Sequence, residues 1–307
     1  SSPGLYDEVD KLLAELKIGD AAQRLASAPV DAGTMLLSKG MLGEAVDSYR
    51  TQSELPEGGQ FRSFAALYGH LLSEIEACDG RASSSEGTGD AKILISIPVW
   101  GVEYIRAMVA ILFPTLLACG NIPKLTEDFQ IQLEISTRES ETELIREMGA
   151  VKALGELKNV HVEIVSFPED IFIEAHNIRG FSYRIMGAMH HLAIHRARAV
   201  GGAHIIFLGS DFILSDRLLT NSVACAESGF DLVLTAPMKV SKKTIVPKLL
   251  DEANDQPSAL ALTIPPRHLV DLGLDAIHPE SRQLIVSVNT RPFSRAPFPL
   301  YFPKDHG

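Results

Sequence analysis

The chain has 307 residues, of which 46% are hydrophobic and 22% are charged, and its formal net charge is −11. This length and composition are typical of a globular protein with one large or two medium domains. The negative charge argues against nucleic acid as the main partner, because proteins bind a phosphate backbone through a basic face.

Cysteine usage and hydropathy favour a cytoplasmic protein. The three cysteines are far apart in the sequence and show neither a disulfide framework nor the spacing of metal ligands (Cys78, Cys119 and Cys225). The longest apolar run, residues 107–120, is too short to span a bilayer and contains Pro114. The first residues lack the charged and apolar regions of a signal peptide. We therefore expect no transmembrane segment.

Residues 1–80 have apolar side chains at the three- and four-residue spacing of helices. Within them, residues 36–50 resemble one tetratricopeptide repeat, with a small residue at Ala45 and an aromatic residue at Tyr49. Because such repeats normally stack in several copies, we interpret residues 1–80 as a helical accessory region that would contact a partner.

Residues 81–90 are polar and rich in glycine and serine, which predicts a linker. From residue 91 to 307 the pattern alternates between strands and helices, which predicts an α/β domain with a mostly parallel sheet flanked by helices. The expected strands are residues 92–98, 130–136, 160–166, 203–208 and 230–235. The proline-rich segment 291–303 is an unusual end for a domain, so we expect the natural chain to continue past Gly307.

The first strand of this domain ends in Pro98-Val99-Trp100-Gly101. The carboxyl edge of a parallel sheet is where open α/β proteins bind ligands. Trp100, the only tryptophan, would either stack on a base or sugar there or fill the corner between strand and helix.

Two arginines are candidates for contact with an anionic ligand. Arg138 follows the second strand, although its neighbours Thr137 and Ser140 also favour a simple helix cap. Arg184 lies in the long helix expected over residues 182–200 and would neutralise a diphosphate near the carboxyl edge. The same helix carries His191 and His195 four residues apart, a spacing compatible with a metal, but hydrogen-bonded imidazoles on a half-buried helix are the simpler interpretation.

The fourth strand ends abruptly in Gly209-Ser210-Asp211. A carboxylate at the end of a buried parallel strand would hold a hard cation, which in turn would hold a diphosphate. The alternative is that Ser210 and Asp211 only cap the segment that follows.

The order of these elements resembles that of nucleotide-sugar glycosyltransferases with the GT-A fold. The resemblance covers about residues 91–240 and rests on the strand followed by Pro98-Val-Trp100, the strand followed by Thr137-Arg138-Glu139, the long helix with Arg184, and the strand that ends in Asp211. In that family the last strand ends in an Asp-any-Asp motif, of which only the last Asp is matched here.

The resemblance implies a donor site and a Mn²⁺ or Mg²⁺ cofactor. Pro98 and Trp100 would lie by the nucleoside, Arg184 by the phosphates, and Asp211 on the metal ion, with Arg138 and Ser210 as further contacts of the nucleotide sugar. The acceptor would be a glycan, a lipid-linked sugar or a protein. An inverting enzyme would also need a carboxylate base, and four residues are available for this role (Glu227, Asp271, Asp275 and Glu280). A further metal ligand, often a histidine in this family, would be His268, His278 or a residue beyond Gly307.

Two other interpretations remain open. One is a non-catalytic binding or scaffold protein with a GT-A-like fold that contacts a partner through residues 1–80. The other is a different doubly wound enzyme that acts on nucleotides or phosphosugars. The sequence contains no glycine-rich dinucleotide motif, P-loop or nucleophile elbow, which disfavours dehydrogenases, P-loop ATPases and α/β-hydrolases.

Overall fold

The computed structural model divides the chain into two compact units. Unit 1 comprises residues 1–100, 132–146 and 161–208, and unit 2 comprises residues 101–131, 147–160 and 209–307. The structure describes residues 32–55, 58–82, 92–173, 178, 180–199, 204–235, 238–254, 260–279, 285–286 and 300–301.

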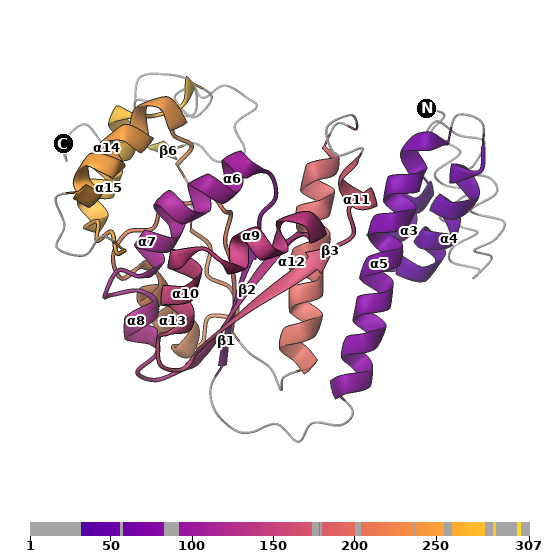
Figure 1. The fold of residues 1–307 in the computed structure, drawn as a ribbon, viewed down its shortest axis with the longest axis horizontal. Coiled ribbons are helices and arrows are strands. Elements are labelled where there is room, and N and C mark those ends of the chain that lie inside the picture. The colour runs from indigo at the N-terminus through magenta and orange to yellow at the C-terminus, as the bar shows by residue number, and fades with distance from the viewer. Residues whose placement is uncertain are drawn as a thin grey trace. The chain divides into compact units, whose positions relative to one another are not determined.

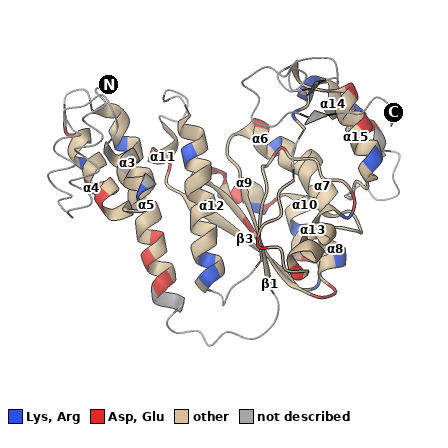
Figure 2. Ribbon diagram, turned by 180° about the vertical axis from the view of Figure 1, so that it is seen from behind, with Lys and Arg blue, Asp and Glu red and all other residues tan. Residues whose placement is uncertain are grey.

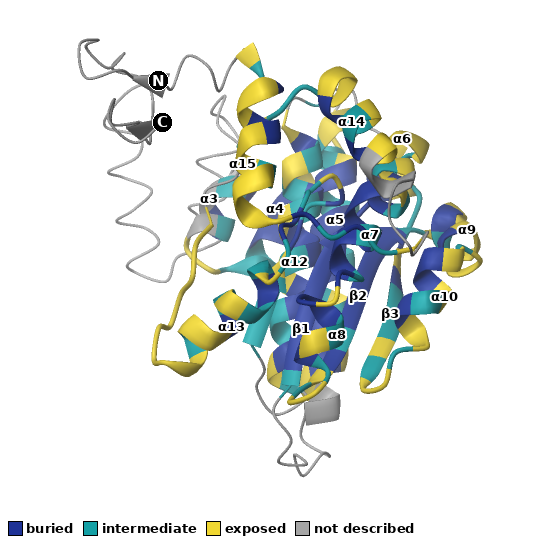
Figure 3. Ribbon diagram, turned by 90° about the vertical axis from the view of Figure 1, so that its left-hand side faces the viewer, coloured by how far each residue is buried: buried dark blue, intermediate teal, exposed yellow. Residues whose placement is uncertain are grey.

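The described residues contain a four-stranded parallel sheet, which confirms the predicted α/β class (Figure 1). Its strands are β1 (Lys92–Pro98), β2 (Gln130–Arg138), β3 (Val160–Phe167) and β4 (His204–Phe207), in the order β3-β2-β1-β4. Every residue of β1 after Lys92 is buried, as expected of a central parallel strand that is covered on both faces (Figure 3).

In unit 1, helix α12 (Phe181–Ala199) covers one face of the sheet next to β1 and β4. Its residues Ala193 and Ala197 pack against Leu94 of β1 and Ile205 of β4. The small alanine side chains allow the helix to approach the strands closely. This contact fixes the position of α12 over the centre of the sheet.

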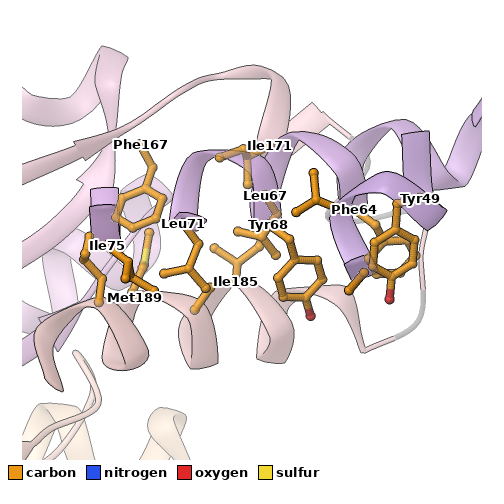
Figure 4. Packing of buried hydrophobic residues seen from close by; sticks show 14 of the residues in the cluster. Tyr49, Phe64, Leu67, Tyr68, Leu71, Ile75, Phe167, Ile171, Ile185 and Met189 are labelled. Carbon is orange, nitrogen blue, oxygen red and sulfur yellow. The ribbon is translucent and has the colours of Figure 1, made fainter. Parts of the chain in front are cut away.

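The described part of the predicted helical region forms α3 (Ala32–Ser38), α4 (Leu42–Ser53) and α5 (Gly59–Ala82). Tyr49 of α4 is fully buried, and its ring stacks on those of Phe64 and Tyr68 of α5 (Figure 4). Gly33 of α3 lies directly against the Tyr49 ring, where a Cβ atom would clash with the ring. Small residues are therefore required at the crossing of α3 and α4.

Helix α5 packs against α12 and against the short helix α11 (Asp170–Ile173), so α3, α4 and α5 share one hydrophobic core with part of the α/β region (Figure 4). Figure 2 shows acidic residues on the C-terminal half of α5 and basic residues at the C-terminal end of α12. The predicted linker, residues 81–90, lies almost entirely outside the described residues. The predicted boundaries at residues 80 and 91 stay a prediction.

The described part of unit 2 is mainly helical. The helices there are α6 (Val102–Ala107), α7 (Phe113–Leu116), α8 (Ile122–Leu125), α10 (Gly149–Gly155), α13 (Leu218–Glu227), α14 (Lys242–Asn254) and α15 (Pro266–Asp275). A π-helical turn, η1 (Met108–Leu112), joins α6 to α7 directly before Pro114, whose missing N–H group interrupts the regular α-helical hydrogen bonding. Residues 102–116 therefore form a continuous but irregular helix.

The fifth predicted strand is wrong. The segment Phe230–Thr235 has no strand pairing, and all of its residues are exposed. Its alternating apolar residues are typical of a strand, but a strand also needs a partner for its backbone groups.

The remaining described elements are short: a 3-10 turn η2 (Glu139–Glu141), α9 (Thr142–Arg146), and the paired strands β5 (Ile285–Val286) and β6 (Leu300–Tyr301). None of the described helices is long and apolar enough to cross a membrane.

Candidate functional site

The strand order identifies one edge of the sheet as the candidate site. From β1 the chain adds β2 and β3 on one side and then returns to add β4 on the other side of β1. The register pairs Ser96 with Phe207, and the Leu208 amide donates a hydrogen bond to the Ser96 carbonyl. The carboxyl ends of β1 and β4 therefore lie side by side at a topological switch point, where open α/β sheets bind ligands.

The chain leaves β1 through Pro98 and Trp100, two of the predicted donor contacts. The Val99 amide between them donates to the Ser136 carbonyl of β2, which holds this exit against the sheet. Trp100 is partly buried, and its ring centroid lies 5.6 Å from that of Phe172 in α11. Trp100 therefore packs against α11 within unit 1 and remains partly exposed, and both interpretations of its role stay predictions.

Arg138 at the end of β2 is held by a carboxylate of its own unit. Its Nη2 atom lies 2.7 Å from Oε1 of Glu141, which is itself buried. The hydrogen bond to Glu141 raises the pKa of Arg138 above its ordinary value. The Ser140 amide in the same turn donates to Glu169. The N-cap residue of this turn is Arg138, and no side chain caps it, so neither Thr137 nor Ser140 is the predicted cap. A phosphate would have to share Arg138 with Glu141.

The contacts of Arg184 connect α12 to the helical region. Its Nη1 atom donates to Oγ1 of Thr34 in α3 at 2.9 Å, and its guanidinium carbon lies 5.1 Å from the centroid of the Phe64 ring in α5. These contacts stabilise the packing of α12 against α3 and α5. The predicted role of Arg184 at donor phosphates remains a prediction.

Ser210 and Asp211 belong to unit 2 and lie in a turn that follows β4. The Phe212 amide donates to the Gly209 carbonyl, and a Cβ atom at Gly209 would clash with the Phe212 ring. Ser210 is buried, whereas Asp211 is exposed. Helix α13 begins only at Leu218 and has Arg217 at its N-cap position, so Asp211 does not cap that helix.

The second acidic residue after β4 has a structural role. Oδ1 of Asp216 accepts a hydrogen bond from the Gly120 amide at 3.0 Å, and the Asp216 amide donates to the Ile264 carbonyl. These bonds tie together three segments of unit 2 that are distant in sequence. The Asp216 carboxylate therefore has a structural hydrogen bond within unit 2, whereas the Asp211 carboxylate is exposed to solvent and could bind a ligand.

The described residues contain no group of three or more His, Cys, Asp or Glu side chains that would hold a metal ion. A single exposed carboxylate still fits Mg²⁺ or Mn²⁺ that arrives with a diphosphate, because Mg²⁺ commonly binds one or two carboxylates, substrate phosphates and water. Asp211 meets this minimal requirement.

The other candidates for a base or a further metal ligand lie in unit 2. Glu227, Asp271 and His268 are exposed, Asp275 forms a 3.2 Å ion pair with Lys248, and His278 is half-buried. Glu280 lies outside the described residues.

The sequence interpretation missed a polar pair formed by a residue near the carboxyl end of β1 and a residue of α12. Nδ1 of His190 in α12 is 3.2 Å from Oγ of Ser96 in β1, and the His190 ring contacts that of Phe207 in β4 edge-on. Burial lowers the pKa of His190 to about 4, so the imidazole is neutral near pH 7. The polar Ser96 within an otherwise apolar strand was the available signal.

Neither a protein-family model nor a curated protein nor a solved structure matches the chain. The topology and the residues that follow β1 and β4 are therefore the features that indicate a function.

Proposed function

We propose that the protein is a glycosyltransferase that moves a sugar from a nucleotide-sugar donor to a glycan, a lipid-linked sugar or a protein, with Mn²⁺ or Mg²⁺ on the donor diphosphate. The main support is the switch point between β1 and β4. From these two strands the chain continues into the Pro98–Gly101 segment and the Gly209–Asp211 turn, which carry the residues expected at a donor site.

In this proposal Trp100 provides the apolar surface for the nucleoside. Its ring is supported by Phe172 and remains partly exposed, so that it can stack on a base without a large rearrangement. Pro98 fixes the backbone as the chain leaves β1. Arg138 would contribute a second bond to a phosphate oxygen while it keeps its bond to Glu141.

Asp211 would hold the cation, and Ser210 would support its turn. When bound, the cation would offset the negative charge that develops on the departing nucleoside diphosphate. The exposed Asp211 carboxylate is free of the packing that holds Asp216, so it can approach a ligand from solvent. The α3–α5 region would recognise the acceptor or a protein partner.

One observation favours the second candidate, a non-catalytic scaffold of the same fold. Both predicted phosphate ligands of unit 1 make contacts within the protein, Arg138 with Glu141 and Arg184 with Thr34 and Phe64. A scaffold would need these arginines only for packing. It would bind no nucleotide, and substitution of Asp211 would change neither its ligands nor its partners.

The two candidates differ in metal-dependent nucleotide binding. We expect calorimetry with UDP, GDP, CDP and ADP to show binding of one of them in the presence of Mn²⁺. Asp211→Asn should abolish this binding and leave the melting temperature unchanged, whereas Asp231→Asn, which changes another exposed aspartate of unit 2, should bind as the wild type does. Binding that is equal in both variants would contradict the role of Asp211, and no binding at all would favour the scaffold.

A further inference from the structure

Two histidines form a pair on the outer surface of α12. His191 and His195 are four residues apart, and their ring centroids are separated by 5.1 Å with an angle of 51° between the rings. His191 is exposed and His195 is half-buried. They differ in this from His190, which contacts Ser96 and Phe207 on the sheet side of the helix.

The surface around the pair leaves room for a ligand. One turn before His191, α12 has Gly187, which is exposed, and a Cβ atom there would find no atom within 4 Å. The neighbouring charge on this face is that of Arg198, which is also exposed. The glycine therefore leaves space beside the exposed His191 for an ion and its water molecules.

We propose that His191 and His195 form a two-imidazole binding site for a divalent transition-metal ion of the Cu²⁺ or Zn²⁺ type. Residues four apart on a helix lie on one face, so the folded helix holds both imidazoles in position for a shared ion. Water completes the coordination, since the described residues supply no third ligand. This site is independent of Asp211, because imidazole selects Cu²⁺ and Zn²⁺ whereas carboxylate and phosphate oxygens select Mg²⁺ and Mn²⁺.

The ligand type also predicts an order of affinity. For a site made of nitrogen ligands, Cu²⁺ binds more tightly than Ni²⁺ and Zn²⁺, and all three bind more tightly than Mn²⁺. Because the spacing of the two imidazoles depends on the helix, Cu²⁺ binds the folded protein better than the unfolded chain. It therefore raises the melting temperature in a concentration-dependent way.

The test is a calorimetric titration of the full chain with Cu²⁺ at pH 7.5. We expect one Cu²⁺ per chain at this site, loss of this binding in His191→Ala and in His195→Ala, and unchanged binding in His161→Ala, which removes an exposed histidine of β3. Asp211→Asn should also bind Cu²⁺ as the wild type does. Electron paramagnetic resonance of the bound Cu²⁺ should show coupling to two nitrogen ligands.

A second variant tests whether Cu²⁺ binding depends on the spacing of the two histidines or only on their number. The double variant His195→Ala/Arg198→His keeps two histidines on the same face but places them seven residues apart, and it removes the positive charge of Arg198. We expect it to lose the Cu²⁺ site. Binding as tight as that of the wild type in this variant, or in either single histidine variant, would overturn the proposal.

Discussion

Arg196 in α12 is the ion-pair partner of Glu134 in β2, with its Nε atom 3.5 Å from Oε2 of the carboxylate. Glu134 is completely buried in the sheet, and Arg196 also pairs with Glu163 of β3. Burial raises the pKa of Glu134 to about 7, although Arg196 acts in the opposite direction. One arginine therefore serves two carboxylates at the contact between α12 and the sheet.

Arg196→Met should strongly destabilise the protein, because it leaves the buried Glu134 without its counter-charge. Removal of one partner of a buried ion pair costs about 3–5 kcal/mol. The loss should be larger at pH 8 than at pH 5, since Glu134 can become protonated at the lower pH. Urea unfolding at the two pH values measures both effects.

The control for this variant is Arg146→Met. Arg146 pairs with Glu143 at the surface, and both side chains are more than half exposed. Surface pairs of this kind contribute about 0–1 kcal/mol. If both substitutions lower the free energy of unfolding by the same amount, the interaction of Arg196 with Glu134 does not stabilise the protein more than a surface ion pair does.

Glu134→Gln should remove a loss of stability that occurs as the pH rises. The folded pKa of about 7 lies above the ordinary value of 4.5, so the folded state binds the proton more tightly than the unfolded state between these values. The contribution of Glu134 is therefore most favourable below pH 4.5 and is lost by pH 7, a change of about 3 kcal/mol at most. The difference in unfolding free energy between variant and wild type, followed from pH 4.5 to 8, should change by a comparable amount. A constant difference would show that Glu134 titrates normally.

His190 should have the opposite effect on the pH dependence. Its folded pKa of about 4 lies below the ordinary value of 6.5, because burial disfavours the charged imidazolium. The unfolded state therefore binds the proton more tightly between these values, and stability falls as the pH is lowered from 6.5 to 4. His190→Gln should make unfolding less sensitive to acid over this range. An acid sensitivity equal to that of the wild type would place the titration in another group.

The strands of the sheet could be predicted closely because their signals are local. Residues 92–98 are predicted and observed as β1, and the predicted ends of β2, β3 and β4 differ from the observed ends by one or two residues. Strand pairing is not a local property, which explains the error at residues 230–235. Helix α14 was missed because Pro247 and the charged residues around it obscure its apolar periodicity.

The candidate site could be predicted only as a set of residue types at strand ends. Topology explains why Pro98 and Trp100 lie at an edge suited to ligands. The contact of Arg184 with Thr34 could not be foreseen, because it joins residues 150 positions apart in the sequence. The contact of Ser96 with His190 could not be foreseen either, because it joins residues 94 positions apart and neither residue alone indicates its partner.

The measurement that tests the proposed function most directly is a fluorescence titration of Trp100. This residue is the only tryptophan, so all indole emission comes from the candidate donor site. With Mn²⁺ present, one of the four nucleoside diphosphates should quench the emission saturably, because a base would stack on the exposed part of the ring. Asp211→Asn should require a much higher nucleotide concentration for the same effect. Emission that no nucleotide changes, in folded protein with Mn²⁺, would contradict a donor site at the ends of β1 and β4.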